Sequence, residues 1–158
     1  MRRTFSAELH KQMAVNPKIW LITADLGYKM WDKVFEDYPD RAINPGAAEQ
    51  TAMDLACGLA LEGKIPFVYS ITSFLLFRPF EAIRTYINHE KLNVKLVGGG
   101  RDKDYEHDGI SHWSEDAHEV LNTLTNIGEY WPETKESIPS ILDEIIKFNG
   151  PDFVSLRR

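Results

Sequence analysis

The chain has 158 residues, a formal net charge of −6 and one cysteine, Cys57. This length suits one domain that buries its own core, and a lone cysteine excludes an internal disulfide, as is usual in a reducing compartment. The acidic balance, with no basic stripe, argues against a nucleic-acid partner. No apolar run approaches the roughly 20 residues of a membrane span. We therefore expect a cytoplasmic protein with a single domain over residues 1–158.

Helical and strand-like patterns alternate along the whole chain. In order, the expected elements are helix 4–15, strand 19–23, helix 31–38, strand 42–44, helix 48–62, strand 66–70, helix 77–89, strand 94–97, helix 115–124, strand 129–131, helix 135–148 and strand 153–156. Such alternation predicts βαβ units in a three-layer α/β/α fold with a mostly parallel sheet. Ligands of such sheets bind beyond the carboxyl ends of the strands, where we place the segments 24–29, 71–77 and 98–114.

The turn at residues 44–46 leads into a helix whose first turn contains Glu49. Two interpretations of Glu49 are open: it is a functional carboxylate, or it only complements the positive end of the helix dipole. Cys57 lies in mid-helix and is expected to be a core residue rather than a nucleophile. Small side chains let another backbone approach closely, so this helix is a candidate for packing against another subunit; its small residues are Ala52, Ala56, Cys57, Gly58 and Ala60.

Aromatic residues follow the strand at 66–70. Phe74 and Phe77 suit an aromatic wall for a planar ligand, although ordinary core packing explains either phenylalanine equally well. The charged, glycine-rich loop at 98–114 is long enough to suggest a functional role.

Three polar residues of that loop, His107, Asp108 and His112, are possible metal ligands. No further ligand pair stands at a zinc spacing, so we expect no metal site. The glycine triplet that opens the loop is not a dinucleotide fingerprint, because the third glycine of that motif would fall at Lys103.

Five motifs in this order resemble the pyrimidine-binding domain of transketolases and deoxyxylulose-phosphate synthases. Residues 23–26 resemble the families' Ser-Ala-Asp-Leu, residues 46–50 their Gly-x-x-Glu-Gln, and residues 58–63 the small-residue helix that ends in Glu-Gly. Residues 74–77 resemble Phe-x-x-Phe, and residues 107–112 resemble Glu-Asp-Gly-Pro-Thr-His. The resemblance covers nearly the whole chain. It implies the thiamine diphosphate-binding fold and thiamine diphosphate as the cofactor.

The resemblance assigns cofactor contacts to four residues. In the family, the glutamate matched by Glu49 hydrogen-bonds N1′ of the aminopyrimidine and promotes the imino tautomer, whose nitrogen takes the C2 proton. Phe74 and Phe77 match aromatics that flank the pyrimidine, and Asp25 matches an aspartate near the cofactor. Because a second subunit closes the family's cleft, we expect Glu49 to be more exposed to water in the isolated chain than in the assembly.

On the substrate side, the resemblance places Asp108 and His112 opposite the hydroxyls of a sugar, as catalytic residues with Glu49. Ile110 and Ser111 replace the family's proline and threonine, which puts the sugar specificity in question more than the cofactor. An arginine that binds substrate phosphate in the family corresponds to Arg157 or Arg158.

The chain contains no Gly-Asp-Gly motif, with which the family binds Mg²⁺ and the diphosphate. We expect a separate diphosphate-binding subunit that carries this motif and holds Mg²⁺, in a homo- or hetero-oligomer. The expected function is that of a split transketolase-like transferase, which moves a two-carbon ketol unit between sugar phosphates or related carbonyl compounds. Two alternatives are an α-keto acid decarboxylase or deoxyxylulose-phosphate synthase-like subunit, and a non-catalytic binding or regulatory module that retains the fold.

Overall fold

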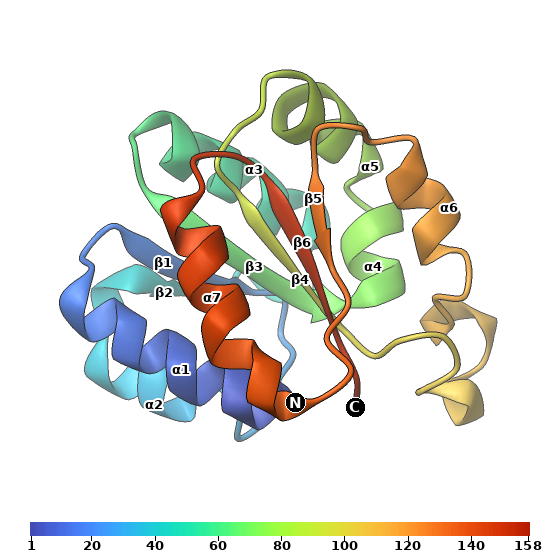
Figure 1. The fold of residues 1–158 in the computed structure, drawn as a ribbon, viewed down its shortest axis with the longest axis horizontal. Helices are drawn as coiled ribbons and strands as arrows, with labels where there is room; N and C mark the ends of the chain where they lie inside the picture. Colours follow the sequence, from blue (N-terminus) through green and yellow to red (C-terminus); the bar gives the residue numbers. More distant parts are fainter.

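The computed structural model describes residues 1–158 and contains one six-stranded sheet between two helical layers (Figure 1). Every pair of neighbouring strands is parallel, in the order β2-β1-β3-β4-β6-β5. The strands are β1 (Ile19–Thr23), β2 (Ala42–Ile43), β3 (Ile65–Ile71), β4 (Lys95–Gly99), β5 (Gly128–Tyr130) and β6 (Asp152–Leu156). The predicted three-layer α/β fold is confirmed.

Helices cover both faces of the sheet. One face carries α1 (Arg2–Val15), α2 (Asp32–Asp37) and α7 (Ile138–Lys147). The other carries α3 (Glu49–Leu61), α4 (Thr72–Phe77), α5 (Phe80–Ala82), the π-helix η2 (Ile83–His89) and α6 (Ala117–Asn122). Short 3₁₀ turns complete the chain at η1 (Pro39–Arg41), η3 (Glu106–Asp108), η4 (Ile110–His112) and η5 (Lys135–Ser137). No helix has both the length and the apolar character that a membrane crossing requires.

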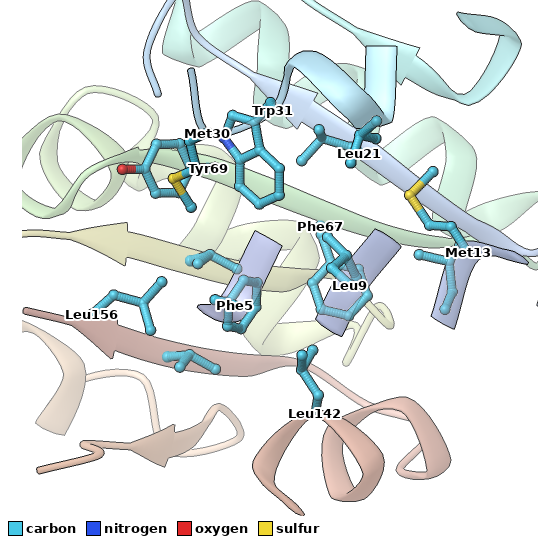
Figure 2. Packing of buried hydrophobic residues seen from close by; sticks show 14 of the residues in the cluster. Phe5, Leu9, Met13, Leu21, Met30, Trp31, Phe67, Tyr69, Leu142 and Leu156 are labelled. Carbon is cyan, nitrogen blue, oxygen red and sulfur yellow. The ribbon is translucent and has the colours of Figure 1, made fainter. Parts of the chain in front are cut away.

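Each helical layer has its own hydrophobic core. Phe5, Leu9 and Met13 lie on one stripe of α1 and pack toward Phe67 of β3 and Leu142 of α7 (Figure 2). This stripe follows the spacing of three to four residues that a helix needs to bury one face. A second cluster on the opposite face includes Ala52, Met53, Ala56 and Cys57 of α3.

One predicted helix begins at the wrong residue. The segment expected at 77–89 starts as α4 at Thr72, is interrupted at Arg78 and Pro79, and continues as α5 and η2 to His89. Pro79 has no N–H to continue the hydrogen-bond ladder, so it separates two helical pieces instead of opening one helix. The segment 71–77, predicted to be a loop, therefore ends β3 at Ile71 and forms the helix α4 over residues 72–77.

The carboxyl ends of the parallel strands face one edge of the sheet. After β1 the chain crosses to β2 on one side, whereas after β3 it crosses to β4 on the other, so the segments after β1 and β3 diverge there. Such a switch point is the usual ligand position in open α/β sheets. Both ends of the chain also lie at this edge (Figure 1). There they contact Tyr105, in the loop after β4: Arg2 donates to the Tyr105 hydroxyl at 2.8 Å, and the guanidinium of Arg158 lies 5.3 Å from the Tyr105 ring centre.

Candidate functional site

Glu49 lies in the first turn of α3 and is only 3% exposed. The Ser70 hydroxyl, at the end of β3, donates to Oε1 at 3.0 Å. The Arg78 guanidinium donates to Oε2 at 2.7 Å. Glu49 is thus already buried in the isolated chain, because side chains from β3 and from the connection between α4 and α5 contact both carboxylate oxygens.

An aromatic surface lies next to this carboxylate. The Arg78 guanidinium carbon is 3.7 Å from the centre of the Phe74 ring, and the His112 ring meets Phe74 edge-on, with centres 4.8 Å apart. Phe77 is 42% exposed at the end of α4. Phe74, Phe77 and Arg78 border a pocket of about 620 Å³, whose full lining is Ser73, Phe74, Phe77, Arg78, Ile110, Ser111, Trp113, Glu115 and Asp116.

Hydroxyl groups at the start of α4 hold this helix against the 98–114 loop. Thr72 donates to the Gly100 carbonyl, and Ser73 donates to the Ser111 carbonyl at 2.7 Å. Gly98 permits the close approach, since a Cβ there would lie 2.5 Å from Thr72 Oγ1. These contacts place Phe74 next to His112, so the sequence-predicted Phe74 and His112 do share one site with Glu49.

The other predicted site residues lie in separate local contacts. Asp25 is exposed, has a left-handed φ of 54°, and exchanges hydrogen bonds with Asn44. Asp108 is exposed and lies 3.2 Å from His107. No group of three His, Cys, Asp or Glu side chains is arranged to hold a metal ion.

The two C-terminal arginines have different surroundings. Arg157 lies 3.6 Å from Asp102 and 3.7 Å from Asp104, both in the charged loop. The Arg158 guanidinium instead faces the Tyr105 ring. Both arginines thus remain candidates for the family's phosphate-binding arginine.

Sequence reasoning missed Ser70 and Arg78. They lie 21 and 29 residues from Glu49 in sequence, so no local spacing connects the three. The available signal was a physical one: a carboxylate buried in a helix needs a counter-charge.

Cys57 is a core residue, as expected. Burial, with a smaller contribution from Asp54, raises the pKa of the Cys57 thiol to about 11, so the thiol stays neutral near pH 7.

A buried carboxylate thus lies beside an aromatic pocket at the carboxyl edge of a parallel sheet, which is where open α/β folds usually bind their ligands. The family profile described as "Transketolase, pyrimidine binding domain" matches residues 1–158. The chain belongs to this family.

Similar proteins include separately encoded subunits. The 6-deoxy-6-sulfo-D-fructose transketolase subunit of Clostridium sp. (strain MSTE9) is 29% identical over 100% of this chain and 49% of its own length. An apulose-4-phosphate transketolase subunit of Actinobacillus succinogenes is 31% identical over 77% of this chain and 39% of its own. A solved structure described as "Split gene transketolase, inactive beta4 tetramer" matches with a TM-score of 0.87 and 31% identity, over 99% of this chain and 51% of that one. The chain thus spans about half the length of such relatives. Further matches are 1-deoxy-D-xylulose-5-phosphate synthases, for example that of Clostridium perfringens at 32% identity.

Proposed function

We propose that this chain is the pyrimidine-binding subunit of a split, thiamine diphosphate-dependent, transketolase-like enzyme. The enzyme transfers a two-carbon ketol unit between sugar phosphates or related carbonyl compounds. The observation that carries the proposal is the buried Glu49 carboxylate next to the Phe74 ring. An aminopyrimidine needs a carboxylate partner for N1′ and a flat apolar surface for its ring, and this site supplies both.

The chain's own residues have distinct roles in this proposal. When bound, thiamine diphosphate supplies the thiazolium C2 carbon that carries the ketol unit. Glu49 exchanges a proton with N1′, and Phe74 and Phe77 hold the pyrimidine ring by stacking. His112 and Asp108 hydrogen-bond the hydroxyls of the sugar.

Asp25 acts on the cofactor side through the turn before α3. The Asn44 amide oxygen accepts hydrogen bonds from the backbone N–H groups of Asp25 and Gly46, both at 3.0 Å. This connection fixes the turn that leads into Glu49. Asp25 is therefore assigned a positioning role for Glu49, in addition to the cofactor contact that the family resemblance implies.

The second half of the site is assigned to another subunit, which carries Gly-Asp-Gly and holds Mg²⁺ and the diphosphate. The outer face of α3 supports such an assembly. Leu55 and Leu61 are 38% and 72% exposed on this helix, and a Cβ at Gly58 between them would meet nothing within 4 Å. A glycine in a helix interior costs about 1 kcal/mol relative to alanine, and no contact inside this chain requires it. Close approach by another subunit explains its presence.

The proposal is tested by reconstitution. The purified chain, a candidate partner with Gly-Asp-Gly, and the two combined are titrated calorimetrically with Mg²⁺ and thiamine diphosphate, and each is assayed with a ketose phosphate donor. We expect tight cofactor binding and ketol transfer only with both chains present. Tight binding to this chain alone contradicts the division of the site between two subunits.

A second candidate follows from the similarity to 1-deoxy-D-xylulose-5-phosphate synthases. That chemistry starts from an α-keto acid rather than a ketose. The same reconstituted enzyme is therefore offered pyruvate as the donor in place of the ketose phosphate. Turnover with pyruvate but not with the ketose phosphate supports the synthase-like function. Absence of turnover with both donors supports the non-catalytic module.

A further inference from the structure

Arg78 makes two contacts that together resemble those of a bound planar ligand. Its guanidinium carbon lies 3.7 Å from the Phe74 ring centre, and the same guanidinium donates at 2.7 Å to Oε2 of Glu49. Ser70 holds the other carboxylate oxygen at 3.0 Å. Both oxygens of Glu49 are thus engaged, and one face of Phe74 is covered.

A guanidinium and an aminopyrimidine are similar in shape and in where they bind. Each is flat and stacks on an aromatic face; in its own plane the guanidinium donates to a carboxylate, whereas N1′ of the aminopyrimidine accepts from a protonated carboxyl group. A pyrimidine stacked on this face of Phe74 with its N1′ directed at Glu49 needs the space and the oxygen that Arg78 now uses. The two groups compete for one position.

We infer that Arg78 is a placeholder: it fills the pyrimidine position in the unliganded subunit and leaves when the cofactor binds. This inference rests on the proposed function, because it takes Glu49 and Phe74 as the pyrimidine contacts. It adds that binding exchanges one planar partner of Glu49 for another.

The surroundings of Arg78 explain why it occupies this position and why it is able to leave. Glu49 is 3% exposed, and a buried carboxylate without a counter-charge is strongly destabilising. Arg78 itself is 46% exposed, and Glu49 is its one carboxylate partner. Glu115 and Asp116 line the same pocket and are both exposed. The freed guanidinium therefore has carboxylates at the pocket rim as alternative partners.

If Arg78 is a placeholder, replacing it should strengthen pyrimidine binding, whereas a mutation in a binding site usually weakens it. Removing Arg78 removes a competitor, so pyrimidine affinity rises. If Arg78 were instead a permanent part of the site that orients Glu49, the same substitution would lower the affinity. The direction of the change separates the two roles.

The experiment uses the full chain and the neutral aminopyrimidine fragment of thiamine, with a methyl group in place of the thiazolium. Ligand-observed NMR measures its Kd for wild type, Arg78→Ala, Arg78→Lys and the control Arg84→Ala, which removes an exposed arginine from η2. We expect Arg78→Ala to lower Kd by about five- to tenfold, between the effects of an exposed ion pair and of a charge-assisted hydrogen bond. Arg84→Ala should leave Kd unchanged. Arg78→Lys retains the counter-charge that folding requires and should give an intermediate Kd.

A second readout follows Arg78 directly. In the free chain its Nε–H resonance should carry a ring-current shift from Phe74, and the fragment should remove that shift. An unchanged shift in the fragment-bound chain, or an equal or weaker affinity in Arg78→Ala, overturns the placeholder while leaving the proposed pyrimidine site intact. Absence of fragment binding to every variant overturns the placeholder, because Arg78 would then compete with no ligand; the proposed function is tested separately by the reconstitution with the partner subunit.

Discussion

Glu49 and Asp152 are the two carboxylate side chains that this fold buries, and their partners differ. Asp152 pairs at 2.6 Å with Lys95, which is 0% exposed and also donates to two backbone carbonyls. Burial lowers the pKa of Lys95 and raises that of Asp152, while their mutual hydrogen bond opposes both shifts. The partner of Glu49 is a half-exposed arginine instead. The first pair is sealed inside the fold at the amino edge of the sheet, and the second is open to exchange at the carboxyl edge.

Lys95 should therefore contribute to stability alone. Lys95→Met leaves Asp152 and two carbonyls buried without a donor, which costs about 3–5 kcal/mol when one member of a buried pair is removed. Urea unfolding followed by circular dichroism measures the loss. Lys147→Met, an exposed lysine on α7, is the matched control and should unfold like wild type. A midpoint for Lys95→Met equal to that of the control would show that the pair is not required.

His112 should act on the substrate rather than the cofactor. In the reconstituted enzyme, His112→Ala and Asp108→Ala should each reduce turnover by about 10- to 100-fold, the effect of losing a charge-assisted hydrogen bond. Cofactor affinity should change little. Because His112 packs against Phe74, His112→Phe is the control that keeps a ring there without its hydrogen-bonding nitrogens, and it should lose turnover as well. Parallel losses of turnover and cofactor affinity would place His112 at the cofactor.

At the scale of elements, most bounds were predictable to within two residues. Buried parallel strands appear as short apolar runs, and α7 shows a single apolar face, so both leave local patterns. The helix after β3 was the exception. Its start depends on hydroxyl contacts from Thr72 and Ser73 to the 98–114 loop, and no local pattern records them.

The site was predictable only in part for the same reason. Glu49, Phe74 and His112 stand in motifs that resemble a known family, so their grouping could be expected. The Arg78–Glu49 pair and the burial of Glu49 arise from tertiary packing between α3, β3 and the α4–α5 connection. They became visible only in the folded chain.

Two glycine substitutions should have opposite effects on the isolated chain. Gly98→Ala places a Cβ 2.5 Å from Thr72 Oγ1 and 3.1 Å from the Phe153 ring, between β4 and α4. Overpacking of this kind costs about 1–3 kcal/mol. Gly58→Ala meets nothing within 4 Å and should add about 1 kcal/mol through helix propensity. Thermal unfolding of both variants checks the signs, and a stabilised Gly98→Ala would contradict the close approach of α4 to β4.

At the scale of the whole molecule, the outer face of α3 carries two exposed leucines beside the polar Thr51 and Asp54. Leu55 and Leu61 flank Gly58 there. The same face would be covered in an assembly with the diphosphate-binding subunit. A larger residue at position 58 should therefore stabilise the isolated helix, whereas the proposed assembly needs a small residue there.

Gly58→Leu should separate helix stability from subunit association. The leucine favours the helix of the isolated chain but blocks close approach by another backbone, so folding persists while association weakens. Sedimentation velocity with the partner subunit measures the association. Ala14→Leu, an exposed alanine on α1 in the opposite layer, should associate like wild type. Unimpaired association of Gly58→Leu would remove α3 from the interface.

Glu49 is proposed to assist proton removal at C2 of thiamine diphosphate, and hydrogen–deuterium exchange at C2 measures that step without knowledge of the substrate. With the partner subunit present, Glu49→Gln should fold and assemble normally yet slow the exchange by about 10²–10⁴-fold, the usual contribution of acid–base catalysis. Glu36→Gln, on the exposed side of α2, should exchange at the wild-type rate. An exchange rate in Glu49→Gln within about threefold of wild type, far below that acid–base contribution, would contradict this catalytic role and leave Glu49 with a structural one.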